Sequence, residues 1–250
     1  MQRSSKTKLI IDPRCPWKLP RLPWNSRKYP YTMSASEWEA LLARANADDP
    51  DAEWGVADRY EDGCKDKAGR IVVRRSARNA AKWLRLAAEH GCASAQNNWA
   101  LLLDKGTVVR RNRREALVWL KRAFRGGGIT AANNIAIIYR EHKKFRNAFQ
   151  WFEKCVAAED GDALVQLGIH YYWGKGVRRD PTAGVRCFRK ATNAKYISGF
   201  GRDDAYFYLG IAYLEGGGVK ASTTTARQLL ERANVDNDHP AARKALLNLS

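Results

Sequence analysis

LGIHYYWGKGV, at residues 167–177, recurs as LGIAYLEGGGV at residues 209–219. Both copies keep Leu-Gly, one tyrosine and the closing Gly-x-Gly-Val at the same spacing. Weaker copies, which conserve residue size rather than identity, begin at Ala52, Ala95 and Ala131. A motif that recurs about every 36 residues is typical of an array in which each unit buries its apolar face against its neighbours.

The second half of each unit repeats small and large residues at offsets of three, four and seven, which are helical offsets. One equivalent position is tryptophan in three units and is replaced in the other two: Trp83, Trp119, Trp151, Cys187 and Leu229. Strand signals such as period-two alternation and Asn-Gly hairpin turns are missing, so the pattern predicts an all-α protein built from helix pairs.

Helix-capping residues occupy one equivalent position in four units: Ser76, Asn112, Asp180 and Ser222. Their side chains accept hydrogen bonds from backbone amides at a helix start. Glu115 stands three residues after its cap and predicts a capping box, and Pro181 stands at the favoured first helical position. Lys144 takes the cap position in the third unit, so we expect that helix to start less cleanly.

With these motifs the chain resembles the Sel-one-like repeat (SLR) family, a relative of the tetratricopeptide repeat, over residues 51–236. The resemblance implies a right-handed α-solenoid of about five helix-turn-helix units. Three departures are an insertion at 64–70, a shortened loop near 141–143 and a long connection at 193–203. We expect these departures to change the local geometry of the repeat at those loops and not the family resemblance.

The predicted organisation is one elongated array with a capping helix at each end. The segments are 1–33, extended and rich in proline, tryptophan and basic residues; 34–50, a capping helix; 51–236, the array, divided at about 51–92, 93–127, 128–161, 162–203 and 204–236; and 237–250, a C-terminal capping helix. Ser34 and Glu37 predict a capping box at the first of these helices.

Several function classes are excluded by what the sequence lacks. The four histidines are scattered, and the glycine runs at 126–128 and 216–218 lack the Lys-Ser or Lys-Thr of a nucleotide loop. We therefore predict no enzyme activity, no cofactor and no metal site, and we interpret the five cysteines as reduced structural thiols. No membrane-spanning run or secretory signal is recognisable, so a cytoplasmic protein is expected.

Positive charge is the second strong feature: 44 lysines and arginines against 26 acidic residues leave a net charge of +18. Basic residues precede successive helix caps, and equivalent loops of stacked repeats lie along one edge. The residues of this predicted basic ridge are Arg74, Arg75, Arg110, Arg111, Lys143, Arg178 and Arg179. Guanidinium groups there suit carboxylates or phosphates.

A second predicted surface is the inner face, assigned by analogy with tetratricopeptide repeats. Its candidate partner-binding residues are Asn97, Asn98, Asn133, Asn134, Arg140, Tyr172, Phe207 and Tyr208. Stacked Asn97 and Asn133 would hydrogen-bond the main chain of a partner, whereas Phe207 and its apolar neighbours would equally suit burial under the closing helix. The asparagines therefore favour binding, and the apolar end leaves both interpretations open.

The N-terminal segment leaves two alternatives. Its basic residues and prolines favour an extended conformation. It is either a disordered arm for an acidic partner or a strap pinned to the array by Trp17 and Trp24, and the tryptophans favour the strap.

These observations predict a non-enzymatic protein-protein interaction module that binds an acidic protein partner through the inner face and the basic ridge. Its resemblance to SLR proteins implies adaptor, regulator or inhibitor roles, among them a bacterial immunity protein that neutralises a secreted toxin. The alternative is a nucleic-acid-binding protein that uses the basic ridge and the N-terminal arm, with Trp17 or Trp24 stacked on bases. The oligomeric state is left open.

Overall fold

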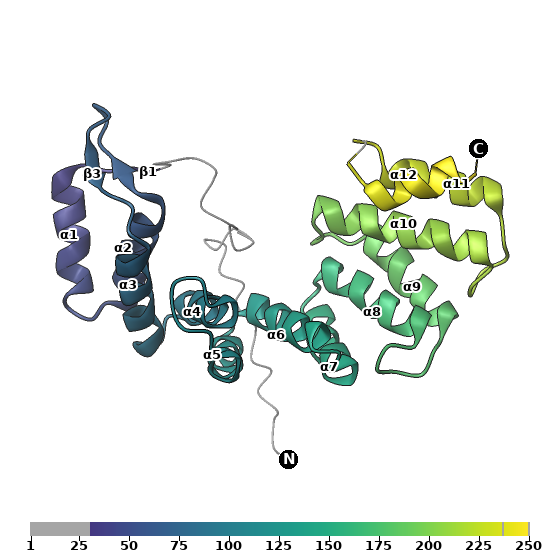
Figure 1. Cartoon of the computed structure of the whole chain (residues 1–250), viewed down its shortest axis with the longest axis horizontal. Helices are drawn as coiled ribbons and strands as arrows, with labels where there is room; N and C mark the ends of the chain where they lie inside the picture. Colours follow the sequence, from purple (N-terminus) through teal and green to yellow (C-terminus); the bar gives the residue numbers. More distant parts are fainter. Residues whose placement is uncertain (1–30, 237, 250) are drawn as a thin grey trace, which may run out of the picture. The chain divides into compact units, whose positions relative to one another are not determined.

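The structure is a computed structural model that describes residues 31–236 and 238–249 (Figure 1). It divides into two compact units, with the division between Ala131 and Ala132. Trp17 and Trp24 lie outside the described residues, so both alternatives for the N-terminal segment stay predictions.

Helix pairs build both units. The first unit holds α1 (Ala35–Ala45), α2 (Pro50–Asp62), α3 (Ala77–Glu89), α4 (Ala93–Lys105) and α5 (Arg113–Arg125), and α6 (Ile129–Glu141) spans the division. The second unit holds α7 (Phe145–Val156), α8 (Gly161–Trp173), α9 (Pro181–Thr192), α10 (Gly199–Glu215), α11 (Thr223–Ala233) and α12 (Pro240–Leu247). The closest packing lies within the pairs α2–α3, α4–α5, α8–α9 and α10–α11. The predicted all-α class is confirmed.

Helices α3, α5, α9 and α11 begin at the four predicted caps, because a side-chain oxygen there accepts a backbone amide of the first turn. Ser34 and Glu37 form the predicted reciprocal capping box. Lys144 makes no side-chain cap bond, as expected. Asn112 differs in detail: its side-chain amide donates to the Glu115 carboxylate at 2.9 Å, in place of the backbone bond that a capping box needs.

The two glycines of the Leu-Gly motif let the helices of a pair approach closely. A Cβ on Gly168 would lie 2.3 Å from the ring of Phe188, and one on Gly210 would lie 2.8 Å from Leu230. Phe188 and Leu230 are fully buried. The glycine of this motif therefore allows α8 to pack closely on α9 and α10 to pack closely on α11.

A small sheet corrects the expectation that strands are absent. The predicted insertion folds as β2 (Cys64–Lys65), which pairs antiparallel with β3 (Ile71–Val73) and parallel with β1 (Tyr31–Thr32). The buried Cys64 thiol donates to the Tyr31 carbonyl at 3.4 Å, and the Arg59 guanidinium lies 3.9 Å from the Tyr31 ring centroid. These contacts attach the chain to the first unit where the described residues begin.

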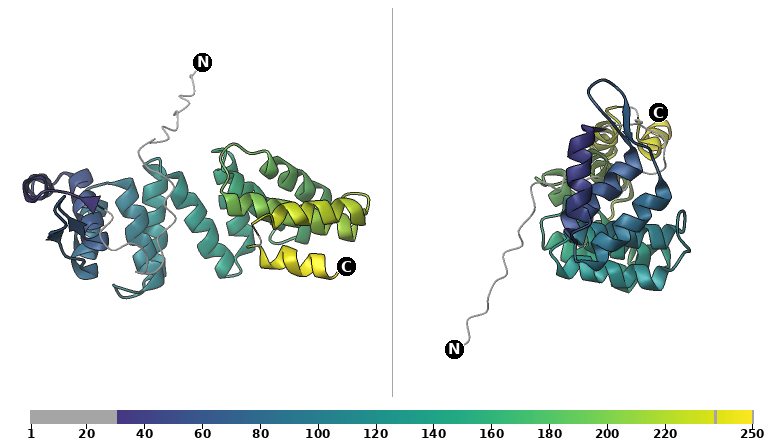
Figure 2. Two further views of the ribbon diagram at one scale, coloured as in Figure 1. Left: turned by 90° about the horizontal axis from the view of Figure 1, so that it is seen from above. Right: turned by 90° about the vertical axis from the view of Figure 1, so that its left-hand side faces the viewer.

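A capping helix covers each end, as predicted. In the first unit Trp38, Leu41 and Leu42 of α1 pack against the buried Ala52 and Val56 of α2. In the second unit α12 packs on α11 around Leu230, Ala233 and Ala242. Figure 2 shows α12 beside α11 in a second view. Within the described residues, no helix has both the length and the apolar character to cross a membrane.

Candidate functional site

Three arginines of the predicted basic ridge hold the ends of helices. In each case the Nε group donates to a backbone carbonyl in the last turn of the preceding helix. The bonds are Arg75 to Glu61 at 3.0 Å, Arg111 to Asp104 at 2.8 Å and Arg179 to Tyr172 at 3.1 Å. A cation there satisfies an orphan carbonyl and opposes the negative end of the helix dipole. These three arginines therefore have a structural role at the helix ends, and their assignment to partner binding stays a prediction.

The other members of the ridge keep their charged groups exposed. Within the described part of the chain, no side-chain hydrogen bond or ion pair engages Arg74, Arg110, Lys143 or Arg178. The ridge thus contains two kinds of cation, one committed to helix ends and one available to a ligand. At the caps Ser76, Asn112 and Asp180 the available arginine stands two residues before the cap, and the committed arginine stands one before it. Lys143 is the exception, because it stands one residue before Lys144 and makes no such bond among the described residues.

One available arginine lines an open hollow of about 580 Å³ inside the second unit. Arg146, Phe149, Gln150 and Glu153 contribute from α7, and the loop after α8 contributes Gly174, Gly176, Val177 and Arg178. The loop approaches α7 closely, since a Cβ on Gly176 would lie 2.3 Å from the Arg146 amide nitrogen. A larger residue at 176 would therefore force this wall of the hollow apart.

The chemistry of the hollow suits an anionic group. Arg146 and Arg178 are both exposed, and two guanidiniums with the Gln150 amide offer planar sets of donors that match a carboxylate or phosphate. The Glu153 carboxylate at the same hollow favours a ligand that also carries a donor, as a peptide does. Phe149 adds an apolar wall.

The two arginines of the hollow occupy fixed positions in the repeat. Arg146 stands two residues after a cap position, and Arg178 stands two before the next. Arg78 and Arg110 hold the same two positions in the first unit, and both are exposed. The predicted basic ridge holds the arginines before the caps, whereas the hollow combines the start of one helix with the loop before the next.

Of three predicted inner-face residues, two are buried and the third is partly buried. Tyr172 is only 1% exposed, and its hydroxyl donates to Glu215 at 2.7 Å. Asn134 is buried at 9% exposure. Phe207 is partly buried and packs against the cluster of Leu230, Ala233 and Ala242, so both interpretations of its role stay predictions. The register analogy failed for Tyr172 and Asn134 because neighbouring helices cover these two positions.

The remaining inner-face candidates have at least one accessible side. Asn97 donates to Asn98 at 3.3 Å, and Arg140 donates to Gln166 at 2.5 Å. Tyr208 stacks on Phe188 with ring centroids 5.3 Å apart. Asn97 and Asn133 lie in different compact units, so the inner column that would join them stays a prediction.

The described thiols lack the environment of a nucleophile. Cys64, Cys92 and Cys155 are buried, and Cys187 is partly buried. Burial raises the pKa of Cys155 to about 12 and also raises the pKa of Cys187. A thiol whose pKa is raised stays protonated at neutral pH and is a poor nucleophile.

Comparisons with known proteins agree with this architecture. A model of the Sel1 repeat matches residues 66–92, 93–128, 161–196 and 203–234. The stretch between the second and third matches contains the predicted third unit, whose loop is short and whose cap is Lys144.

Solved structures show the same fold. A Sel1 repeat protein from Oxalobacter formigenes is 24% identical at a TM-score of 0.70 and is covered to 83% by 84% of this chain. A protective antigen with an SLR fold from uropathogenic Escherichia coli is 23% identical at a TM-score of 0.61, and 86% of this chain covers 52% of it. An immunity protein from Pseudomonas aeruginosa is 12% identical over 84% of this chain and 78% of its own, and its TM-score of 0.45 carries no functional argument.

Proposed function

Because the chain belongs to the Sel1 repeat family, whose repeats generally mediate protein-protein interactions and are not typically catalytic, we propose that it is a non-enzymatic interaction module for an acidic protein. An acidic segment of the partner binds the available arginines of the basic ridge. Arg146 and Arg178 form its anchor in the second unit. An immunity protein that neutralises a secreted toxin is the narrower role to test first, and an adaptor or regulator is the alternative role.

The hollow between α7 and the loop after α8 carries this proposal. It combines two exposed guanidiniums with an amide and an aromatic wall, and its residues belong to one compact unit. Arg179, by contrast, is engaged with a helix carbonyl. The available cations are therefore those that the fold does not use, which is the distribution expected of a binding surface.

Net charge supports the same partner. A charge of +18 raises the association rate with an acidic partner, and the effect weakens as salt screens it. Basic side chains within about one Debye length of each other act together. Association should therefore slow at high ionic strength, while dissociation reports the contacts in the hollow.

Affinity capture with matched variants tests the proposal. The bait is the full chain, either unchanged, as the double variant Arg146→Gln/Arg178→Gln, or as the control Arg243→Gln on α12. Arg243 is exposed and lies in the same unit, away from the hollow. Lysate of the native source is treated with nuclease, and bound proteins are quantified by mass spectrometry.

The expected result is an acidic protein retained by the unchanged chain and by Arg243→Gln but lost with the double variant. Each hydrogen bond to a charged group contributes about 1.5–3 kcal/mol, so the double variant should weaken the purified complex by about 100-fold or more. Equal capture by all three baits would reject the hollow as the site. In a parallel capture without nuclease, recovery of nucleic acid and of no protein would favour the nucleic-acid alternative.

A further inference from the structure

Three metal-ligating side chains meet in the first unit, away from the basic ridge. Asp48 lies in the turn between α1 and α2, Glu53 lies in the first turn of α2, and His90 follows the end of α3. One ligand atom from each lies within 4.8 Å of the others. We refer to these three residues as the carboxylate-histidine cluster.

Glu53 is the unusual member because its side chain is 1% exposed. Both of its carboxylate oxygens lie 2.9 Å from Nδ1 of His90, whose side chain is 35% exposed. A buried carboxylate is costly unless a cation and hydrogen bonds compensate it, and one imidazole is a small compensation. Both oxygens of the buried Glu53 carboxylate therefore face the same partner, the partly exposed ring of His90.

The repeat does not require this arrangement. The positions equivalent to Glu53 in the later units are Gln96, Ala132, Leu164 and Tyr206, none of them acidic. A buried ion pair can often be replaced by apolar residues without loss of stability. Packing of the unit therefore does not explain why the first unit keeps a buried glutamate facing a histidine.

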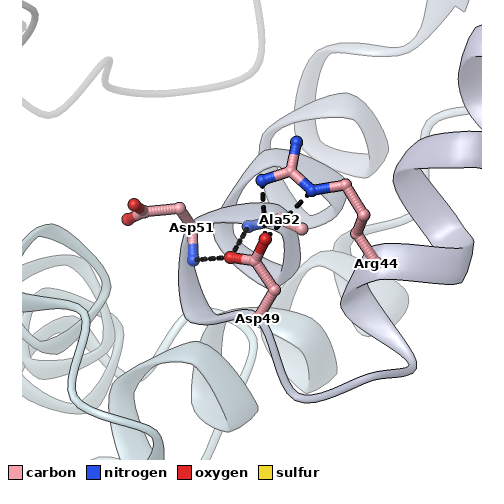
Figure 3. A network of polar contacts seen from close by, with 4 residues as sticks. All are labelled: Arg44, Asp49, Asp51 and Ala52. Atoms are coloured by element: carbon pink, nitrogen blue, oxygen red, sulfur yellow. Dashed lines mark hydrogen bonds and ion pairs between the residues drawn. The ribbon is translucent and has the colours of Figure 1, made fainter.

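In the turn that contains Asp48, the next residue, Asp49, is bonded to Arg44 and to the backbone amides of Asp51 and Ala52 (Figure 3). One oxygen of Asp49 accepts the amides of Asp51 and Ala52, and the other binds the Arg44 guanidinium at 2.6 Å. Asp49 is thus fully engaged as the cap of α2. Asp48 has no side-chain hydrogen bond or ion pair within the described residues.

We propose that Asp48, Glu53 and His90 bind a divalent transition metal ion of the zinc type. Nδ1 of His90 supplies its lone pair, with the ring proton on Nε2, and the two carboxylates supply oxygen ligands. Imidazole with carboxylates favours such ions over Ca²⁺ or Mg²⁺, which prefer oxygen ligands throughout. Water completes the coordination on the exposed side. The bound ion compensates the buried Glu53 charge and links the α1–α2 turn to the end of α3.

Titration with zinc and cobalt chloride tests this site in the full chain. Isothermal calorimetry gives stoichiometry and Kd for Zn²⁺, and the visible bands of Co²⁺ report the ligand geometry. The variants Glu53→Gln and His90→Gln remove ligands with little change in size. Asp48→Asn does the same at an exposed position, so it remains informative if a core variant unfolds.

Two controls match these variants. Asp51→Asn removes an exposed carboxylate in the same turn, and His142→Gln removes an exposed histidine elsewhere. Outer-shell partners alone change metal affinity by about 10–100-fold, so loss of a ligand should weaken Zn²⁺ binding by at least about 100-fold, while both controls bind like the unchanged chain. The unchanged chain should also melt at a higher temperature with Zn²⁺, an effect that Asp48→Asn removes.

Two results would overturn the site. One is the absence of a one-to-one Zn²⁺ complex in the unchanged chain. The other is a complex whose affinity and cobalt spectrum are the same in folded Asp48→Asn as in the unchanged chain. Neither result bears on the basic ridge, because Asp48 and Glu53 take no part in the hollow of the second unit.

Discussion

Two glycines of one loop separate the cost of backbone conformation from the cost of packing between repeats. Gly216 and Gly218 both follow α10, with φ of 68° and 74°. A Cβ on Gly216 would make an ordinary contact of 3.5 Å with Ala221. A Cβ on Gly218 would lie 2.5 Å from the Pro181 carbonyl carbon and 2.6 Å from the Thr182 amide nitrogen, at the start of α9.

These geometries set the expected free energies. Alanine in a left-handed conformation costs about 1–2 kcal/mol, so Gly216→Ala should lower the free energy of unfolding by that amount. Gly218→Ala carries the same conformational cost. It also forces the loop away from the backbone of α9, which adds about 1–3 kcal/mol because overpacking moves structure that cannot rotate aside. The difference between the two variants is therefore about 1–3 kcal/mol.

Urea denaturation followed by circular dichroism measures this difference, with free energies taken from the midpoint and slope. Hydrogen exchange of the α9 amides shows where stability is lost. The larger loss for Gly218→Ala should coincide with faster exchange at the start of α9. Equal midpoints for the two variants would refute the claim that the Gly-x-Gly loop packs on the preceding helix pair.

Three further predictions concern charge. Arg179→Gln should lower the free energy of unfolding by about 1 kcal/mol without weakening partner capture, whereas Arg178→Gln should weaken capture alone, as denaturation and binding assays will show. Lys144→Asp should raise stability by about 1 kcal/mol in urea denaturation, because α7 lacks a side-chain cap bond; an unchanged midpoint would contradict this. Burial lowers the pKa of His170, so the unfolded chain takes up the proton first and stability falls as pH drops below about 6.5. His170→Gln should flatten that loss in pH-dependent unfolding, and a loss that persists as it does in His142→Gln would refute the assignment.

Much of the fold was predictable because its determinants are local. Asp180 caps α9 through its own side chain, and the Leu-Gly motif of Gly168 recurs at Gly210 with the same spacing to its neighbours. The small sheet was not predictable, since each strand is short and β1 pairs with a segment distant in the sequence. Periodicity cannot detect strands of two or three residues.

The candidate site was predictable only in outline. Loop register predicted where arginines gather, but it did not distinguish Arg178, which is available, from Arg179, which holds a helix carbonyl. The inner-face analogy placed Tyr172 on a surface, whereas its ring is buried and its hydroxyl bonds to Glu215. Register determines the direction of a side chain from its own helix and says nothing about what covers it.

The sequence by itself determined that this chain stacks helix pairs, where several of those helices begin, and that positive charge collects before their caps, because caps, glycines and small residues act within a few positions of themselves. Tertiary structure alone decided which arginines remain available and which carboxylate is buried. Glu53 and His90 are 37 residues apart, and only the packing of α2 against α3 brings them together. Burial and pairing depend on distant neighbours, so they follow from the folded structure.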